Sequence, residues 1–313
     1  MKVLQTYSLP FDTKRYLNEN GIEVDIFETG ISYEEILQIV EKYDGIISLL
    51  SNRIDRNILE KGKNLKVVAN YAVGYDNIDT SYAKEKNIFV TNTPDVLTEA
   101  TADVAFALLL SVTRRIVESD EFVRKGEFKG WKPDLLLGKD LFGKTLGIYG
   151  FGRIGKAVAR RAKGFGMDII FTDENVKDET LARKVDFEKL IKQSDFISIN
   201  APLNETTLYR FDIEVFKKMK KNVIIINTAR GKIIKEKDLV YALKNNIISG
   251  AGLDVYENEP LIEEELLKMK NVVLLPHIGS ATEETREKMA KICVRSVVEV
   301  LIEKRRPEKC VNF

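Results

Sequence analysis

The single histidine of this 313-residue chain, His277, directly follows an apolar run of strand length. Histidine is the usual proton carrier near neutral pH, although a histidine judged by its type alone is more often a surface or structural residue. Arg230 and Glu259 stand in similar positions, each a few residues after an apolar run. A guanidinium presents a fork of donors that matches a carboxylate, and a carboxylate bonded to an imidazole fixes its tautomer and favours its charged form.

Three glycines supply a second chemical signal. Gly150, Gly152 and Gly155 form a G-x-G-x-x-G motif between an apolar run at 146–149 and a helical pattern at 156–165. We expect Gly150 to permit a tight turn, Gly152 to let the backbone approach a pyrophosphate, and Gly155 to let the helix pack close to the strand. The pyrophosphate would bind the N–H groups at the helix start. An ordinary strand–helix turn is the alternative, but the motif and its flanking elements predict dinucleotide binding.

The acid after the motif supports this prediction and indicates the cofactor. Asp173 follows Gly155 by 18 residues, where it can accept hydrogen bonds from an adenosine ribose. Asp173 and Glu174 would repel a 2′-phosphate, and no Arg or Lys occurs between them and Lys177. The sequence therefore predicts NAD in preference to NADP.

Taken alone, Arg230 is as well explained as a surface arginine, and Glu259 as a solvated loop acid. On the edge of a dinucleotide-binding sheet, however, they join His277 to supply an anion clamp, a proton carrier and an acid that orients the carrier. This combination is suited to hydride transfer between a nicotinamide and the carbon of a 2-oxo or 2-hydroxy acid. Arg230 would hold the substrate carboxylate and polarise the oxygen, while His277 exchanges the proton.

The composition limits the other function classes. A length of 313 residues, 44% of them hydrophobic, indicates two domains, and a net charge of +1 gives no electrostatic basis for binding nucleic acid or an anionic membrane surface. Cys293 and Cys310 have neither metal-ligand spacing nor a disulfide pattern, so we expect no metal site and a cytoplasmic location. The N-terminal residues lack the apolar core of a signal peptide, and the apolar run at 104–110 is too short to cross a bilayer.

The elements that must position these residues follow an alternating order. Helical patterns lie between strand-like runs both before and after the glycine motif, which predicts parallel α/β sheets. Residues 99–122 are predicted to form one long helix that bridges two domains, and the last helix is expected at 282–303. The expected strands are residues 2–6, 23–27, 45–50, 65–69, 88–91, 146–149, 196–200, 223–227, 250–254 and 272–275, with further helices at 33–43 and 79–86.

Several motifs together resemble a known enzyme family. The segments that carry the resemblance cover nearly the whole chain and are residues 70–79, 90–103, 151–173, 227–232, 250–260 and 276–282. They resemble the D-isomer-specific 2-hydroxyacid dehydrogenase family, and the run Gly-Ser-Ala-Thr at 279–282 is most similar to its glyoxylate and hydroxypyruvate reductase branch. Phosphoglycerate dehydrogenases of serine synthesis are similar too and stay an alternative.

The resemblance implies two doubly wound parallel-sheet domains. A Rossmann NAD-binding domain, residues 99–286, would be inserted in a flavodoxin-like substrate domain made of residues 1–98 and 287–313. It also implies a homodimer built on the long helix and on the loop near Trp131. The substrate would be a small 2-oxo or 2-hydroxy acid.

The resemblance also implies roles for single residues. Arg230, Glu259 and His277 form the catalytic set, and the backbone amides of Val73 and Gly74 donate to the substrate carboxylate. Asp254 lies near the nicotinamide amide. The residues implied around NAD are Thr101, Gly150, Gly152, Arg153, Ile154, Gly155, Asp173, Pro202, Thr228, Ala229, Asp254 and Gly279.

Two departures from the family pattern concern the cofactor. This chain has Asn200 where many relatives have a histidine, and Glu174 where many have a proline. Besides phosphoglycerate dehydrogenase, two alternatives stay open: a non-enzymatic NAD-sensing module similar to transcriptional corepressors, and oxidation of formate or phosphite on a related fold.

Overall fold

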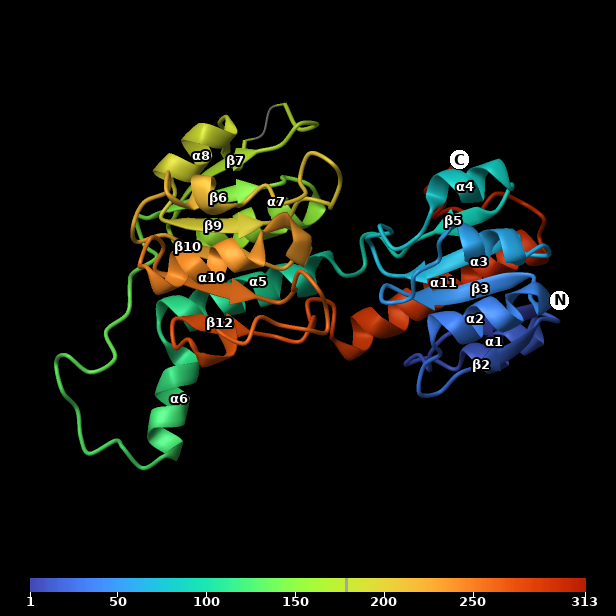
Figure 1. The fold of residues 1–313 in the computed structure, drawn as a ribbon, viewed down its shortest axis with the longest axis horizontal. Coiled ribbons are helices and arrows are strands. Elements are labelled where there is room, and N and C mark those ends of the chain that lie inside the picture. The colour runs from blue at the N-terminus through green and yellow to red at the C-terminus, as the bar shows by residue number, and fades with distance from the viewer. Residues whose placement is uncertain (178–179) are drawn as a thin grey trace. The chain divides into compact units, whose positions relative to one another are not determined.

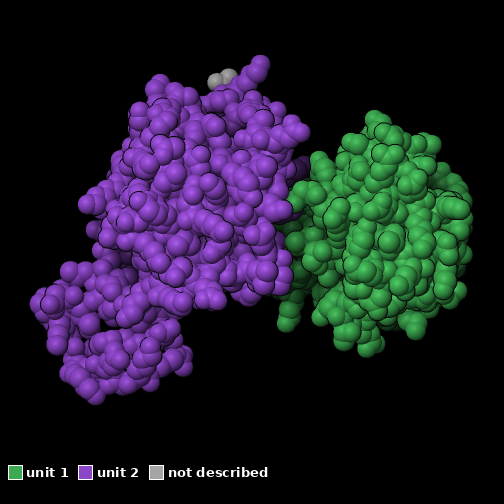
Figure 2. All heavy atoms as spheres, viewed as in Figure 1, with its two compact units in different colours: residues 1–97, 280–313 green, residues 98–279 purple. Residues whose placement is uncertain are grey.

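The computed structural model describes residues 1–177 and 180–313, which form two compact units (Figures 1 and 2). Unit 1 consists of residues 1–97 and 280–313, and unit 2 of residues 98–279. Each unit is built on a parallel sheet with helices between most successive strands, so the predicted fold class is confirmed. None of the helices formed by the described residues has the length and apolar character that crossing a bilayer requires.

All residues of unit 1 are described, and its five-stranded parallel sheet has the order β2-β1-β3-β4-β5. This is the flavodoxin-like order. The strands are β1 (Lys2–Gln5), β2 (Glu23–Ile26), β3 (Gly45–Leu49), β4 (Val67–Tyr71) and β5 (Phe89–Thr91). The helices are α1 (Thr13–Glu19), α2 (Tyr33–Ile39), α3 (Arg56–Lys61), α4 (Thr80–Glu85) and α11 (Glu283–Leu301), with a 3-10 turn η1 at Val40–Lys42.

Short helices in unit 1 depend on capping and packing. Helices of six or seven residues are not stable alone, because nucleation costs more than so few hydrogen bonds return. Asp12, Ser32, Asp55 and Asp79 cap α1, α2, α3 and α4 through their side-chain oxygens. The interior strand β4 is buried along its whole length, as is typical of a parallel sheet covered on both faces. This sheet holds the loop that follows β4 in a fixed place.

Within its described residues, unit 2 has a seven-stranded parallel sheet with the order β12-β11-β10-β9-β6-β7-β8. The order is that of a Rossmann sheet with one strand added at an edge. The strands are β6 (Thr145–Tyr149), β7 (Asp168–Thr172), β8 (Arg183–Lys184), β9 (Phe196–Ile199), β10 (Ile224–Asn227), β11 (Gly250–Leu253) and β12 (Val272–Leu274). The helices are α5 (Thr98–Thr113), α6 (Ile116–Arg124), α7 (Arg153–Gly164), α8 (Phe187–Gln193), α9 (Ile213–Phe216) and α10 (Glu236–Lys244), with 3-10 turns η2 at Gly231–Ile233 and η3 at Leu266–Lys268.

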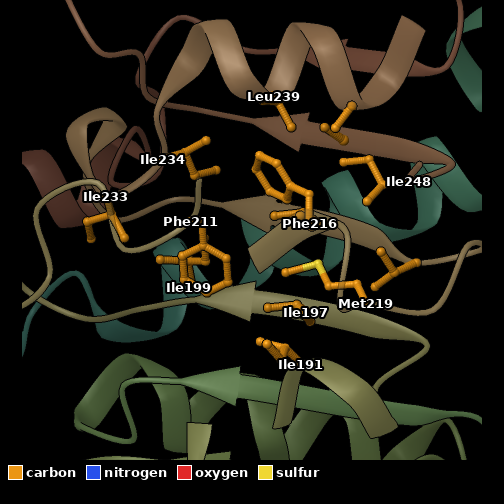
Figure 3. Packing of buried hydrophobic residues seen from close by; sticks show 14 of the residues in the cluster. Ile191, Ile197, Ile199, Phe211, Phe216, Met219, Ile233, Ile234, Leu239 and Ile248 are labelled. Carbon is orange, nitrogen blue, oxygen red and sulfur yellow. The ribbon is translucent and has the colours of Figure 1, made fainter. Parts of the chain in front are cut away.

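A hydrophobic cluster on one face of this sheet anchors the loops that carry the candidate site. Ile197 and Ile199 of β9 pack with Phe211, Phe216 and Leu239 from the helices and connections that cover them (Figure 3). Burying a side chain of this size stabilises a fold by roughly 1.5–3 kcal/mol. The ends of β9, β10 and β11 are therefore rigid supports.

The long helix predicted at 99–122 is wrong in one respect, because it is two helices. α5 ends at Thr113, Arg115 has a left-handed φ of +54°, and α6 begins at Ile116. The carbonyl oxygen of Thr113 accepts a hydrogen bond from the backbone amide of Lys139 instead of continuing the helix. A contact with a distant part of the chain thus ends α5.

Candidate active site

The glycine motif connects β6 to α7, at the point between β6 and β9 where the strand order of the sheet reverses. Gly150 has a φ of +88°, and a Cβ there would lie 2.5 Å from the backbone nitrogen of Ala201, in the loop after β9. A Cβ at Gly155 would lie 2.2 Å from the carbonyl oxygen of Gly150. Only glycine fits at these two positions, and the helix packs close to the strand as expected.

Gly152 has a different part in the motif. It is the N-cap residue of α7, and a Cβ added to it would meet open space rather than another described residue. Arg153 and Ile154 are the first two residues of the helix. The first amides of a helix lack intrahelical acceptors and attract an anion. This helix start has the form that a pyrophosphate requires.

Asp173 holds the glycine loop in place. One carboxylate oxygen accepts from the amide of Phe151 at 2.7 Å, and the other accepts from the amides of Asn175 at 2.8 Å and Val176 at 3.0 Å. A carboxylate offers about four acceptor sites, so these three bonds leave room for a ribose hydroxyl. The ribose contact of Asp173 stays a prediction.

Two buried side-chain oxygens at this edge of the sheet have no hydrogen-bond partner in the described part of the chain. They are Oδ1 of Asn200, just after β9, and Oγ1 of Thr228, just after β10. Buried polar groups are nearly always hydrogen-bonded, so each oxygen is suited to a partner that a ligand supplies. Together with the open side of Gly152, they fit a bound dinucleotide.

Other residues implied around the cofactor lie in the same loops. Pro202 lies two residues after Asn200, and Ala229 directly follows Thr228. Thr101 in α5 contacts the loop after β12, because a Cβ at Gly279 would lie 3.3 Å from Cγ2 of Thr101 and 3.1 Å from a carboxylate oxygen of Asp254. The structure therefore brings Thr101, Asp254 and Gly279 together.

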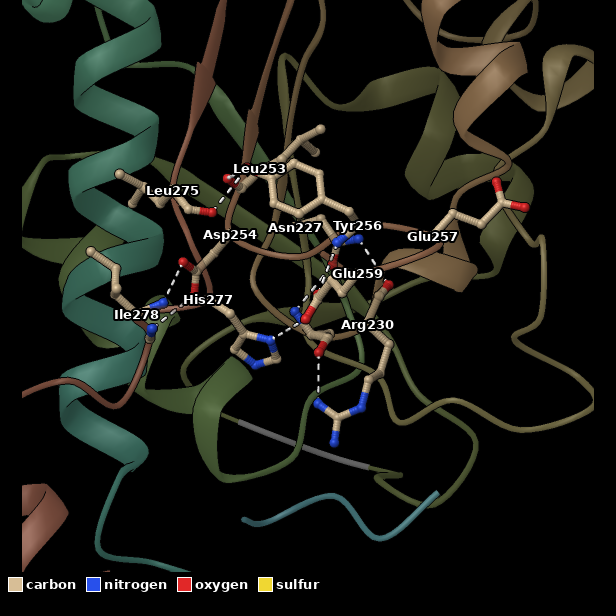
Figure 4. A network of polar contacts seen from close by, with 12 residues as sticks. Asn227, Arg230, Leu253, Asp254, Tyr256, Glu257, Glu259, Leu275, His277 and Ile278 are labelled. Atoms are coloured by element: carbon tan, nitrogen blue, oxygen red, sulfur yellow. Dashed lines mark hydrogen bonds and ion pairs between the residues drawn. The ribbon is translucent and has the colours of Figure 1, made fainter. Parts of the chain in front are cut away.

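The histidine and the glutamate form a hydrogen-bonded pair. Nδ1 of His277 lies 2.8 Å from Oε2 of Glu259, and both side chains are half-buried (Figure 4). The other oxygen of Glu259 accepts from the backbone amide of Tyr256 at 3.0 Å. Because Nδ1 is engaged by the carboxylate, Nε2 is the ring nitrogen left to meet a substrate.

Several effects act on the Glu259 carboxyl. Burial raises its pKa, but the bond from His277, the amide of Tyr256 and the positive charge of Arg230 together hold the pKa below its ordinary value. Glu259 is therefore ionised near neutral pH.

Asp254 fixes the backbone that carries the histidine. His277 has a left-handed φ of +54°, which is uncommon for a residue with a side chain. The two carboxylate oxygens of Asp254 accept from the next two amides, those of Ile278 and Gly279, both at 2.7 Å. Asp254 is 1% exposed, and burial raises its pKa although both amides act to lower it.

Arg230 lies close to this pair. Its backbone carbonyl accepts from Nδ2 of Asn227 at 2.9 Å, and its Nη1 donates to the carbonyl of Ala229 at 2.8 Å. The positive charge of the guanidinium acts to lower the pKa of the Glu259 carboxyl. Figure 4 shows the guanidinium and the imidazole of His277 extending toward the same side of the loops. The structure thus brings the three predicted catalytic residues together.

Sequence reasoning missed a pair of glutamates that supports these loops, which we call the carboxylate clamp. The two side-chain oxygens of Glu236 accept from the amides of Glu257 at 2.9 Å and Glu263 at 3.0 Å. In return, Glu257 accepts from the amide of Glu236 at 2.9 Å and from the hydroxyl of Tyr209 at 2.8 Å. The clamp fastens the start of α10 to the loop that contains Glu259.

A close backbone contact reinforces the clamp. A Cβ at Gly231 would lie 1.8 Å from the carbonyl carbon of Tyr256, so the segment with Arg230 packs directly on the loop with Glu259. An acid in the first turn of a helix is a recognisable signal, and Glu236 has that position. Its partner is 21 residues away, which no local pattern reveals.

The remaining predicted residues belong to unit 1. Val73 and Gly74 lie between β4 and α4 and are half-buried. Their carbonyl groups accept hydrogen bonds from asparagine side chains.

Comparisons with known proteins identify the family. A family model described as "D-isomer specific 2-hydroxyacid dehydrogenase, NAD binding domain" matches residues 106–279. Over 301 residues, 91% of each chain, the protein is 53% identical to a glyoxylate reductase of Thermococcus litoralis. The chain belongs to the D-isomer-specific 2-hydroxyacid dehydrogenase family. This membership confirms the predicted family, NAD as the cofactor that its binding domain takes, and an oxidoreductase acting on CH–OH groups.

Solved structures of this dehydrogenase family have the same fold. The crystal structure of the TT0316 protein from Thermus thermophilus is 43% identical, with a TM-score of 0.94 over 99% of this chain and 100% of that one. The crystal structure of a glyoxylate reductase from Paecilomyes thermophila is 34% identical, with a TM-score of 0.90 over 99% of this chain and 98% of that one.

Proposed function

We propose that this protein is an NAD-dependent reductase of a small 2-oxo acid of the glyoxylate or hydroxypyruvate type, with His277 as the proton donor. The observation that carries the proposal is the 2.8 Å contact between His277 and Glu259, with Arg230 close by. The names of the similar glyoxylate reductases support this substrate class.

The chain's own residues have complementary tasks in this reaction. The cofactor, when bound, supplies the hydride. His277 donates a proton from Nε2 to the substrate oxygen, and Glu259 balances the positive charge of the imidazolium. Arg230 binds the substrate carboxylate with its planar fork and polarises the 2-oxo group. Asp254 keeps the turn after His277 in place, so the imidazole direction is set before substrate arrives.

The two units divide the binding of the ligands. We assign cofactor binding to unit 2, on the glycine motif and the loops after β9 and β10. In addition to Arg230, we assign recognition of the substrate carboxylate to the amides of Val73 and Gly74 in unit 1. The proposed preference for NAD over NADP rests on Asp173 and Glu174, whose charges oppose a 2′-phosphate. We expect the Kd of NADPH to exceed that of NADH by about tenfold or more, measured by fluorescence titration. Equal affinities would contradict the preference.

A steady-state assay tests the reductase itself. NADH oxidation should be followed with glyoxylate, hydroxypyruvate, pyruvate and phosphohydroxypyruvate. We expect turnover with one of the two proposed substrate types, glyoxylate or hydroxypyruvate. A strong preference for phosphohydroxypyruvate would instead favour a phosphoglycerate dehydrogenase, and NADH binding without turnover of any 2-oxo acid would favour a sensing module.

The apolar surface of α6 supports a homodimer. α6, all of whose residues are described, has no buried side chain, and with the chain that follows it extends away from the body of unit 2 (Figures 1 and 2). The exposed apolar side chains of this arm are Ile116, Val117, Val123, Phe128, Trp131 and Leu137. Trp131 is 82% exposed, and such a surface is usually covered by a partner.

Light scattering tests the dimer. We expect the wild-type protein to have the mass of a dimer and the double variant Val117→Asp, Val123→Asp to be a monomer, because two charges would enter an apolar contact. Leu208→Asp is a matched control, since Leu208 is also exposed in unit 2 but outside the arm. A monomeric wild-type protein would contradict the proposal.

We also propose a cytoplasmic location, since Cys293 and Cys310 are both free thiols.

A further inference from the structure

The loop after β4 in unit 1 is held by two asparagine side chains that no motif assigns to a function. Nδ2 of Asn92 donates to the carbonyl of Val73 at 2.7 Å, and Nδ2 of Asn70 donates to the carbonyl of Gly74 at 2.8 Å. Asn70 is completely buried, and Asn92 is 9% exposed. These contacts fix the carbonyl sides of two successive peptide groups.

A third peptide group is fixed in the same way by the backbone. The amide of Thr93 donates to the carbonyl of Ala72 at 2.8 Å. In a trans peptide group, the N–H of the next residue points away from the carbonyl. The three anchored carbonyls of residues 72–74 therefore turn the N–H groups of Val73, Gly74 and Tyr75 away from their anchors.

Successive amides held in this manner suit an anion. Oriented backbone N–H groups form concavities that bind carboxylates and phosphates without a charged side chain. A hydrogen bond accepted by a carbonyl also polarises the peptide group and strengthens the donor on its other side. The asparagines thus affect both the direction and the strength of the amides.

The side chain of Asn70 is itself locked. Its Oδ1 accepts from the hydroxyl of Ser48 at 3.2 Å and from Nδ2 of Asn77 at 3.3 Å. Asn77 in turn donates to the carbonyl of Asn52 at 2.9 Å. Because donors approach its oxygen, the amide nitrogen of Asn70 must face the carbonyl of Gly74. The loop is held by a buried network and not by one weak contact.

We propose that Asn70 and Asn92 are positioning residues for substrate recognition, which hold the loop so that the amides of Val73 and Gly74 can bind the carboxylate of the 2-oxo acid. Asn92 orients the amide of Gly74, and Asn70 fixes the next peptide group, whose N–H belongs to Tyr75. This inference rests on the proposed function, in which these amides take the substrate carboxylate. The asparagines contact neither substrate nor cofactor in this scheme. Their loss weakens substrate binding and leaves cofactor binding intact.

Kinetics of Asn92 variants test the proposal. Asn92→Ala removes the donor, Asn92→Leu removes it while keeping the side-chain size, and Asn92→Gln keeps a donor on a longer stem. We expect the KM for glyoxylate to rise about tenfold in the Ala and Leu variants and to recover partly in Gln. We expect kcat at saturating substrate to stay within about twofold, and the Kd of NADH from fluorescence titration to stay unchanged.

A matched control separates positioning from stability. Asn20 in unit 1 also donates from Nδ2 to a backbone carbonyl, that of Tyr16 at 2.8 Å, at the end of α1. Asn20→Ala should leave the KM for glyoxylate unchanged even if Tm falls. An unchanged KM in folded Asn92→Ala and Asn92→Leu would overturn the proposal. So would a rise in KM of the same size in Asn20→Ala.

The proposed function can fail separately. A wild-type protein that binds NADH but reduces no 2-oxo acid would contradict the reductase. Calorimetric titration of the NADH complex with oxalate, a non-reacting carboxylate, then tests the loop alone. Weaker oxalate binding in Asn92→Ala would support the inference, and equal binding would refute it.

Discussion

The loop after β4 in unit 1 and the loops after β10, β11 and β12 in unit 2 use the same chemical groups in opposite ways. In unit 1, backbone amides are the proposed recognition groups, and the side chains of Asn70 and Asn92 hold them. In unit 2, the side chains of Arg230, Glu259 and His277 are the proposed reactive groups, and backbone amides hold the acids.

This difference follows from the different tasks proposed for the loops of the two units. Binding a carboxylate needs only fixed donors, which neutral amides provide at low desolvation cost. Proton transfer and charge balance need groups that ionise, and ionised groups need backbone donors around them to stay ionised when buried. Substrate recognition therefore requires fixed backbone donors, whereas proton transfer requires ionisable side chains. Substitutions in each unit test this difference.

The largest effect is expected for Arg230→Lys. A lysine has a point charge and cannot replace a planar fork on a carboxylate. We expect kcat/KM for glyoxylate to fall about 100-fold or more. Arg210→Lys is the matched control, because that guanidinium lies 4.0 Å over the ring of Phe187 and has no proposed role. Unchanged turnover in Arg230→Lys would show that the side chain of Arg230 does not recognise the substrate carboxylate.

Glu259→Gln tests charge balance through the pH dependence. The reduction needs a protonated imidazole, so the rate falls as the pH rises and that proton is lost. Removing the negative partner makes the imidazolium less stable, and we expect the alkaline fall in kcat/KM to move about one pH unit or more toward acid. On the acid side, the lowered pKa of Glu259 keeps wild-type Glu259 ionised until the pH falls through that pKa. An unchanged pH dependence of kcat/KM in Glu259→Gln would show that Glu259 has no role in the mechanism.

Glu236→Gln tests the carboxylate clamp. Glutamine has one acceptor oxygen, whereas the amides of Glu257 and Glu263 each need one. We expect kcat to fall about three- to tenfold and unfolding to become easier by about 1–3 kcal/mol, the cost of a buried amide without a partner. The control is Glu188→Gln, which breaks an exposed ion pair with Lys192. If kcat is unaffected while Tm falls, the clamp is structural only.

The smallest effect is expected for Ser48→Ala in unit 1. This change removes one of the donors to Asn70 and leaves Asn77 in place. We expect the KM for glyoxylate to rise by no more than about twofold, measured beside the Asn92 variants. A rise as large as that of Asn92→Ala would mean that Ser48 alone determines the orientation of Asn70.

Much of the fold could be predicted because its signals are local. Each of the ten expected strands lies within a residue or two of an observed one, whereas the two-residue strand β8 was not expected. Alternation with helices predicted both parallel sheets. The short helices α2 and α4 were found, but α1, α3, α8, α9 and α10 were not, because a helix of four to nine residues shows little helical period and depends on capping and packing. The break at Arg115 was missed because the amide that ends α5 comes from Lys139.

In the candidate site, too, residues with a local sequence signal could be predicted and residues with long-range partners could not. His277, Arg230 and Glu259 could be found from residue type and position at strand ends, and the structure brings them together. Glu236 and Asn92 could not be found, because their partners are defined by the folded backbone and not by spacing along the chain. Side chains that hold a distant backbone segment have no recognisable pattern in a single sequence.

The turn at His277 offers a practical route to a trapped complex. Its left-handed backbone is held by Asp254 through the two amides that follow, so the turn does not depend on the imidazole. Asparagine tolerates this conformation better than most side chains. His277→Asn should therefore be an inert protein with the backbone of this turn unchanged, able to retain reduced cofactor and unreacted 2-oxo acid long enough for crystallography to capture both.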